Sequence, residues 1–158
     1  MEMSIHGVKL LKEWEGCKSH VYNDPAGIPT IGVGHKLTQS ELSSGKITIK
    51  GAAIKCAEGL SDQQMIDLLA QDLRPAQEAV NGDVTVALTQ NRFDALVSFT
   101  FNVGTGAFAA STLRKVLNQG NYDEVPNQLR RWVHAGGNVL PGLVTRRENE
   151  IKLWNGAI

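Results

Sequence analysis

Three residues near the N-terminus, Glu15, Asp24 and Thr30, carry side chains that together could hydrolyse a glycosidic bond. That reaction needs one carboxylic acid to protonate the leaving oxygen, a second carboxylate that stays ionised, and a group that holds a water molecule. Glu15 and Asp24 would supply the two carboxyl groups, and Thr30 would supply a hydroxyl. The surrounding sequence predicts a helix end, a tight turn and a strand as the elements that position them.

The segment 4–15 predicts a short helix that ends at Glu15. Ser4 is a favourable N-cap, Gly16 is a typical helix stop, and apolar residues recur on about one face, at Ile5, Val8, Leu11 and Trp14. The macrodipole disfavours a negative charge in the last turn of a helix, and Trp14 offers an apolar neighbour. Both effects favour a protonated Glu15, as a general acid requires. The alternative is a solvated glutamate at a frayed helix end.

Asp24 starts the sequence Asp-Pro-Ala-Gly, which is typical of a type I turn. The flanking residues 20–22 and 30–33 suit two strands, so we expect Asp24 at the top of a hairpin and Thr30 on its second strand. Glycines interleave with that strand, and such glycines commonly mark the close approach of a ligand or of another backbone. Each residue alone has a plainer interpretation, because an aspartate in this position usually bonds its own turn and threonine is an ordinary strand residue.

The spacing of Glu15, Asp24 and Thr30 resembles the Glu/Asp/Thr triad of the phage-type lysozymes, or endolysins, of glycoside hydrolase family 24. Other segments agree with that family over nearly the whole chain, so the resemblance is specific. They are Trp14-Glu15-Gly16, Thr30-Ile31-Gly32-Val33-Gly34-His35, Leu37-Thr38, Arg92-Phe93-Asp94-Ala95-Leu96, Phe101-Asn102-Val103-Gly104 and Leu140-Pro141-Gly142-Leu143. Some members place a cysteine at the middle position of the triad; this chain has Asp24 there, so neither of its cysteines is assigned a catalytic role.

The resemblance implies an α+β fold that is predominantly α, with two lobes in a single lysozyme-like domain, residues 1–158. Residues 15–72 would form a small lobe with an antiparallel sheet, and residues 1–14 and 73–158 would form a helical-bundle lobe. A length of 158 residues agrees with one domain. A groove between two lobes would suit an extended glycan strand.

Patterns of caps and apolar residues predict the remaining elements. The run 46–50 alternates and predicts a short strand. Ser61 and Gln64 predict a capping box at the start of a helix, which Pro75 should interrupt. The apolar face of that helix should be buried, and it consists of Met65, Leu68, Leu69, Leu73, Ala76 and Val80. Four further helices are expected to start near Thr89, Thr112, Asp123 and Pro141.

By the same resemblance the substrate is peptidoglycan, cut at the β-1,4 bond between N-acetylmuramic acid and N-acetylglucosamine without a cofactor or metal ion. Glu15 would be the acid, Asp24 would orient or activate water or stabilise an oxocarbenium-like transition state, and Thr30 would hold the water. The family favours inversion of the anomeric centre, which requires carboxyl groups ~6.5–9.5 Å apart, whereas a retaining site has ~5–5.5 Å. Spacing along the sequence does not decide between them.

The resemblance also marks His35, Phe101 and Asn102 as candidate substrate-binding residues. In the family, a histidine at the place of His35 pairs with an acid on the helix after Ser61. Asp72 lies on the apolar face of that helix, where an unpaired carboxylate is costly. We therefore expect a structural His35–Asp72 ion pair, which would raise the pKa of the histidine.

The sequence does not decide which anion pairs with Arg147, or whether the two cysteines are bonded to each other. Arg147 shares an apolar stripe of the last helix, and an inward arginine needs an anion, for which Glu15 is one candidate. Helical phase favours Arg147 over Arg146 for the inward position. Cys17 and Cys56 are the only cysteines, and synthesis in a cytoplasm favours free thiols over a disulfide.

Composition and charge limit the possible binding partners of the protein and its possible location in the cell. The chain has 16 acidic and 16 basic side chains, so its net charge attracts no anionic polymer, and no basic cluster indicates nucleic-acid binding. Residues 1–11 lack the apolar run of a signal peptide or membrane helix. We expect a monomer without stable membrane insertion, made in the host bacterial cytoplasm and acting on periplasmic peptidoglycan. Its release would depend on a separate membrane-permeabilising factor.

Three other functions remain compatible with parts of the sequence. A lytic transglycosylase would use one glutamate as both acid and base and would leave an anhydro sugar. A zinc amidase would need a His-rich site, and the four histidines show no ligand spacing. A wall-binding module without catalysis would leave the Glu15, Asp24 and Thr30 set without a purpose.

Overall fold

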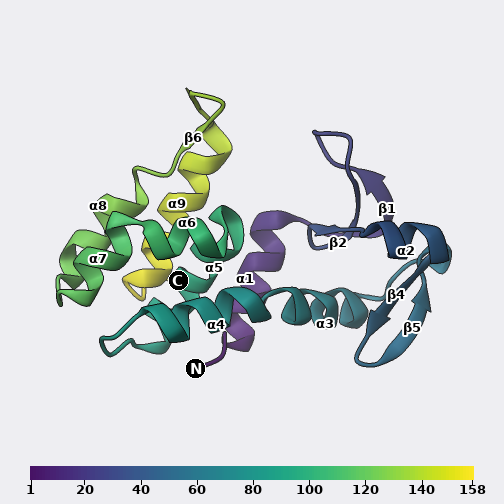
Figure 1. Cartoon of the computed structure of the whole chain (residues 1–158), viewed down its shortest axis with the longest axis horizontal. Helices are drawn as coiled ribbons and strands as arrows, with labels where there is room; N and C mark the ends of the chain where they lie inside the picture. The colour runs from purple at the N-terminus through teal and green to yellow at the C-terminus, as the bar shows by residue number, and fades with distance from the viewer. The chain divides into compact units, whose positions relative to one another are not determined.

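The computed structural model describes all residues, 1–158, and has a predominantly helical α+β fold, which confirms the expected class (Figure 1). The helices are α1 (Ile5–Glu15), α2 (Gln39–Ser44), α3 (Asp62–Asp72), α4 (Arg74–Asp83), α5 (Gln90–Val103), α6 (Thr105–Ala110), α7 (Thr112–Asn118), α8 (Val125–Leu129) and α9 (Pro141–Trp154). The strands are β1 (Lys18–Asn23), β2 (Pro29–Gly32), β3 (His35–Lys36), β4 (Lys46–Ile49), β5 (Ala52–Lys55), β6 (His134–Ala135) and β7 (Asn138–Val139), and two 3-10 turns are η1 (Cys56–Glu58) and η2 (Tyr122–Glu124). None of the helices has both the length and the apolarity needed to cross a bilayer.

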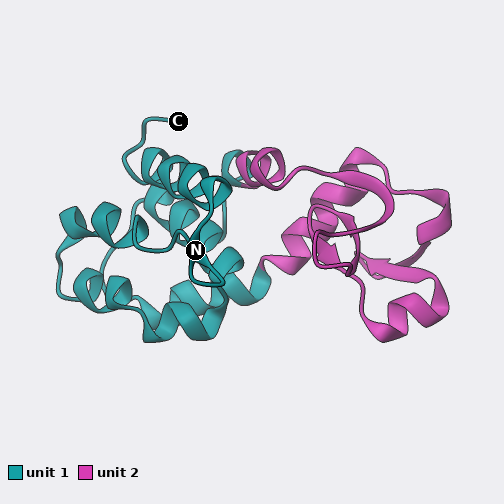
Figure 2. Cartoon of the chain, turned by 90° about the horizontal axis from the view of Figure 1, so that it is seen from above, with its two compact units in different colours: residues 1–7, 74–158 teal, residues 8–73 magenta.

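Two compact units make up the chain (Figure 2). One consists of residues 1–7 and 74–158 and is helical apart from the β6–β7 hairpin, and the other consists of residues 8–73 and contains the remaining strands. The chain passes from one unit to the other within α1 and again between α3 and α4. We had expected residues 8–14 in the helical part, whereas the structure groups them with the strands.

The antiparallel sheet β1–β2–β3 carries two of the candidate catalytic residues near its turns. Tyr22 of β1 pairs with Thr30 of β2, and β2 also pairs with β3. The central strand β2 is the buried one. Gly32 and Gly34 have φ values of +65° and +69°, a left-handed conformation that side chains rarely adopt. The turn from β2 into β3 therefore requires glycine at both positions.

A second hairpin, β4–β5, is braced by α3. Lys50 and Gly51 close it, and both have positive φ, which is typical of a type I′ turn. The Gln71 side chain accepts from the backbone N–H of Lys50 (3.0 Å) and donates to the carbonyl of Thr48 (3.0 Å). The alternating run at 46–50 correctly predicted β4. β5 escaped prediction because three of its four residues are exposed, so no apolar period marks it.

The capping box at the start of α3 is confirmed, since the Ser61 hydroxyl accepts from the Gln64 N–H and the Gln64 side chain accepts from the Ser61 N–H. The predicted apolar residues of α3 and α4 are all buried. Leu73 separates the two helices, directly before Arg74-Pro75, as the proline predicts. Both cysteines are free thiols, as expected, with Cys17 exposed and Cys56 buried.

Helix α5 forms the centre of the helical unit, because every residue from Phe93 to Thr100 is buried. Its predicted cap is confirmed: the Thr89 hydroxyl accepts from the Arg92 N–H at 3.3 Å. The helix ends at Gly104, which has a φ of +100°. α9 packs along α5 and begins at Pro141, as predicted.

Two predictions for the region after α5 are wrong. Ser111 caps α7 in place of Thr112, since its hydroxyl accepts from the Arg114 N–H at 3.1 Å. The helix expected to start near Asp123 would end at the glycine pair Gly136-Gly137, but α8 stops at Leu129, and the two glycines form the turn of the β6–β7 hairpin. The short helix α6 was not foreseen.

The buried carboxylate of Asp94 fixes the first turn of α1. It accepts from the backbone N–H of Ser4 (3.0 Å), from the Ser4 hydroxyl and from the Gln90 amide (2.8 Å). Ser4 also caps the helix as predicted, because its hydroxyl accepts from the Gly7 N–H at 3.0 Å. Since Gly7 faces Asp94, Ile5 points away; it was expected on the buried face and is 76% exposed.

We expect Gly7→Ala to destabilise the protein by about 1–3 kcal/mol. The added methyl would lie 2.8 Å from the Asp94 Oδ2 atom, so a buried carboxylate held by three hydrogen bonds would have to move. Gly82→Ala on α4 is the matched control, because a Cβ there meets no atom within 4 Å. Urea unfolding measures both variants, and equal losses would contradict the role given to the Asp94 contact.

Candidate active site

Glu15 is the last residue of α1, and its carboxyl group reaches the turn between β2 and β3. Its Oε2 atom lies 3.9 Å from the position that a Cβ on Gly34 would occupy. Gly16, with φ +73°, ends the helix directly after it, as predicted. The side chain is half-buried, so the carboxyl group is held at the surface of the sheet-containing unit with limited exposure to water.

Asp24 closes the β1–β2 hairpin with its backbone and with one carboxylate oxygen. Its carbonyl accepts from the Gly27 N–H at 2.8 Å, as the type I turn predicts. Its Oδ1 atom accepts from the N–H groups of Ala26 (2.9 Å) and Ile28 (2.8 Å). No protein group donates to Oδ2. The aspartate therefore bonds its own turn and still presents one oxygen outward.

Thr30 lies on the central strand β2 and is only 2% exposed. Its hydroxyl donates to the carbonyl of Ile28 at 2.9 Å, and the same carbonyl accepts from the Asp24 N–H at 2.9 Å. Because the threonine hydrogen is used in this bond, the hydroxyl oxygen is left as an acceptor. The peptide groups of Ile28 thus hold Asp24 and Thr30 in a fixed relation.

His35 is held between two carboxylates. Its Nδ1 atom lies 2.8 Å from Asp72 Oδ2, which confirms the predicted pair, and its Nε2 atom lies 2.9 Å from Glu41 Oε1. The hydrogen bond to Asp72 does most to raise the pKa of His35; burial works against it, and the Asp72 charge and Glu41 add to the rise, so the pKa is about 9. The ring is therefore charged at neutral pH.

Glu41 is the member of this cluster that we did not predict. Thr38 and Glu41 form a capping box on α2, in which Glu41 accepts from the Thr38 N–H at 2.9 Å. Burial raises the pKa of Glu41, but the hydrogen bonds from Thr38 and His35 outweigh it and hold the pKa below its usual value. The Thr-x-x-Glu pattern was a readable signal for α2. Both ring nitrogens of His35 are used, so the sugar contact expected of it stays a prediction.

The His35 cluster should make stability depend on pH. The pKa is near 6.5 when unfolded and about 9 when folded, so the contribution is complete below the first value and lost as the pH rises through the second. The loss should reach about 3 kcal/mol in urea unfolding between about pH 6 and pH 9.5. His35→Gln should abolish this dependence, and His134→Gln, on an exposed strand, should keep it. A wild-type curve that stays flat over this range would contradict the assignment.

Phe101 and Asn102 lie on the last turn of α5, in the helical unit. Phe101 is half-buried, and Asn102 is exposed. The Arg147 guanidinium donates to the Asn102 Oδ1 atom. Because a guanidinium can only donate, the amide oxygen must face Arg147. The NH2 group of Asn102 is therefore the part presented to a ligand.

Arg147 is 1% exposed and finds its anion on its own helix. It donates to Glu150 Oε1 at 2.7 Å and to the Trp132 carbonyl at 2.9 Å. The preference for Arg147 alone as the inward arginine is wrong, because Arg146 is also buried and donates to Glu150 and to Ser98. The buried face of α9 is wide enough to include both arginines, and both donate to Glu150.

Solved structures with the same fold include a lysozyme and a muramidase domain. The crystal structure of a mutant of P22 lysozyme matches with a TM-score of 0.82 and 35% identity, covering 98% of this chain and 99% of that one. The muramidase domain of SpmX from Asticaccaulis excentricus matches with a TM-score of 0.78 and 34% identity, covering 97% of both chains. The lysozyme-like fold is therefore established.

The chain belongs to the phage lysozyme family, whose model matches residues 12–150. The endolysin of Salmonella phage P22 is 37% identical over 136 residues, which cover 86% of each protein. The endolysin of Bacillus phage B103 is 35% identical over 159 residues, which cover 98% of this chain but 54% of that protein. The chain thus spans about half the length of the Bacillus phage relatives it matches.

Proposed function

We propose that the protein is a muramidase that hydrolyses the β-1,4 bond between N-acetylmuramic acid and N-acetylglucosamine in peptidoglycan. Membership of the phage lysozyme family supports this, as do relatives named endolysin and a structural neighbour named a muramidase domain. The observation that carries the proposal is the arrangement around Ile28. It fixes Asp24 and Thr30 together and leaves Asp24 Oδ2 and the Thr30 hydroxyl oxygen as acceptors.

Two acceptors tied to the peptide groups of one residue suit the binding of a nucleophilic water. In the proposed mechanism one hydrogen of the water faces Asp24 Oδ2 and the other faces the Thr30 oxygen, so a lone pair is directed at the anomeric carbon. Glu15 protonates the leaving glycosidic oxygen, and Asp24 accepts the proton that the water loses. Attack by a water on the face opposite the leaving group inverts the anomeric centre. No metal ion or cofactor enters this scheme.

His35, Phe101 and Asn102 remain proposed substrate contacts, with different roles. The outward NH2 group of Asn102 would donate to an acceptor such as the carbonyl oxygen of an N-acetyl group. Phe101 would offer part of an aromatic ring to a sugar face. His35 would not bind the sugar through its ring nitrogens, since both already bind carboxylates. Its contribution would come from its place on strand β3.

The biological role that we propose is host cell lysis by a phage. The protein would be made in the bacterial cytoplasm and would reach the periplasmic peptidoglycan after a separate factor permeabilises the inner membrane. It would act as a monomer on glycan strands, without nucleic acid and without stable insertion in the membrane.

Digestion of purified sacculi, followed by mass spectrometry of the fragments, tests the proposed activity. A muramidase adds one water per bond cut and leaves N-acetylmuramic acid at the reducing end. A lytic transglycosylase would leave an anhydro sugar without that water, and a wall-binding module would release no fragment. NMR of the first product formed would show an α-anomer if the enzyme inverts and a β-anomer if it retains configuration.

We expect Thr30→Val to reduce the rate of sacculus digestion by about 10²-fold or more, since a positioned group that contacts the reacting water commonly contributes this much. Thr30→Ser is the matched variant, because it keeps the hydroxyl and its bond to the Ile28 carbonyl. It should retain most of the activity. Equal activity of the two variants would exclude a role for the hydroxyl.

A further inference from the structure

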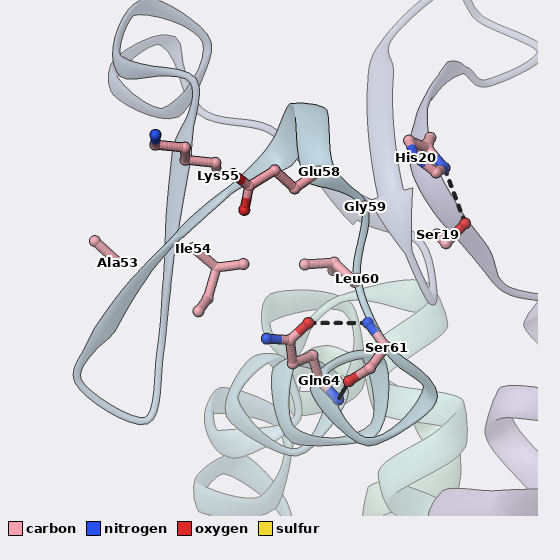
Figure 3. Close-up of a pocket in the computed structure, with 10 residues that line it drawn as sticks. All are labelled: Ser19, His20, Ala53, Ile54, Lys55, Glu58, Gly59, Leu60, Ser61 and Gln64. Carbon is pink, nitrogen blue, oxygen red and sulfur yellow. Dashed lines mark hydrogen bonds between the residues drawn. The ribbon is translucent and has the colours of Figure 1, made fainter.

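A pocket of about 700 Å³ opens between β1, β5 and the start of α3 (Figure 3). Ser19 and His20 of β1 form one wall, residues 53–55 of β5 form the other, and Leu60 lies between them. Volumes of about 300–1,000 Å³ are usual for sites that bind small ligands. None of the residues assigned to catalysis or to sugar contact lines this pocket.

The pocket presents one charge of each sign. Lys55 and Glu58 both line it, and neither forms an ion pair anywhere in residues 1–158. Ile54, Ala53 and Leu60 add apolar surface beside them. A ligand that satisfies both charges must carry an anionic and a cationic group, and a short zwitterionic peptide with a carboxylate and an amino group meets this requirement, whereas an uncharged sugar does not.

Two further polar groups are held in place at the pocket. The capping box fixes the Gln64 side-chain oxygen on the Ser61 N–H at 2.9 Å, so its NH2 group turns toward the pocket (Figure 3). The His20 ring lies over Gly59, where a Cβ would come within 2.8 Å of it, and its Nδ1 atom is 3.0 Å from the Ser19 hydroxyl. Both groups are therefore positioned before a ligand arrives.

The two strands beside the pocket are edge strands. β1 is the outer strand of its sheet, and β5 has a partner on one side only. Edge strands expose unpaired N–H and C=O groups, and an extended peptide can add to them. The carbonyl of Ser19 already accepts from the Leu60 N–H at 2.8 Å, so a bound peptide must use other backbone groups along these edges.

We propose that this pocket binds the stem peptide of the wall substrate, with a peptide carboxylate at Lys55 and a peptide amino group at Glu58. The inference rests on the proposed function, which supplies a glycan strand that carries such peptides. β1 connects the pocket to the turn at Asp24, and its four steps from Ser19 to Asn23 span ~13 Å. An extended peptide of four residues covers about the same length. A strand bound for cleavage can therefore reach the pocket with its peptide.

The test is an NMR titration of the full-length, 15N-labelled protein with the free tetrapeptide L-Ala–D-Glu–diaminopimelate–D-Ala. We expect shifts in the amides of Ser19, Lys55, Glu58 and Gln64. Lys55→Met and Glu58→Gln should each raise the dissociation constant about tenfold, as expected for the loss of a hydrogen bond to a charged group. Lys152→Met, at an exposed position of α9, is the control and should leave it unchanged.

Three results would overturn the proposal: peptide shifts confined to other residues, equal affinities of Lys55→Met and Lys152→Met, or shifts of the pocket amides by chitotetraose and not by the peptide.

Enzyme kinetics distinguish a failure of the peptide-binding proposal from a failure of the proposed function. Lys55→Met should raise KM on intact sacculi and leave the rate on peptide-free glycan strands unchanged. If the protein does not cleave glycan strands, the wild-type protein cuts neither substrate, and if it is a lytic transglycosylase, the fragments of both substrates carry anhydro sugars.

Discussion

Glu15→Gln is expected to lower the rate of sacculus digestion by about 10²–10⁴-fold, the usual contribution of a general acid. The amide is nearly the same size as the carboxyl group but has no proton of suitable acidity for the leaving oxygen. The variant should still fold and still bind the wall, because the turn that it faces keeps its own hydrogen bonds and glycine conformations. Clearing of sacculi measures the rate, and pelleting with sacculi measures binding.

Glu13→Gln is the matched control, since Glu13 is an exposed residue of the same helix, two positions earlier. It should retain the full rate. Asp24→Asn tests the second carboxylate separately, because asparagine keeps the side-chain oxygen that accepts from Ala26 and Ile28 while it removes the charge. Substantial hydrolysis by Glu15→Gln would refute the assignment of this residue as the acid, whatever the other variants do.

Local sequence patterns predicted the elements that carry the candidate site. The Asp-Pro-Ala-Gly turn, the N-caps at Ser4 and Thr89 and the helix stop at Gly16 each depend on a few neighbouring residues, and all are present. Such patterns hold because the backbone groups at a turn or helix end must find partners close by. The resemblance to a known family added the His35–Asp72 pair, which no local pattern contains.

The features that the sequence analysis missed have different causes. β5 is a strand because β4 pairs with it, although its own residues are mostly exposed. The β6–β7 hairpin replaced an expected helix because two consecutive glycines with positive φ turn the chain there. Gly32 and Gly34 were thought to mark a close approach, but their backbone conformation already requires glycine. Glu41 was overlooked because its capping pattern and its contact with His35 lie in a segment with little apolar periodicity.

Local sequence patterns also did not predict the buried charged side chains of the helical unit. Glu150 is fully buried and accepts from Arg147 at 2.7 Å, from Arg146 at 3.4 Å and from the Ser98 hydroxyl at 2.6 Å. This carboxylate thus accepts hydrogen bonds from two guanidinium groups that have almost no contact with water. Taking charged groups out of water is costly, so the Arg147 guanidinium depends on this partner. The same cluster positions the Asn102 amide through Arg147.

Glu150→Gln should therefore destabilise the protein by about 3–5 kcal/mol, because it removes the negative charge that pairs with the buried guanidinium of Arg147. Glu148→Gln on the same helix is the matched control: its ion pair with Arg130 is largely exposed, and such pairs contribute about 0–1 kcal/mol. Urea unfolding near neutral pH measures both free energies of unfolding. Losses of similar size in the two variants would mean that water or a rearranged side chain compensates the arginines, and that the buried carboxylate is not what holds Arg147 against Asn102.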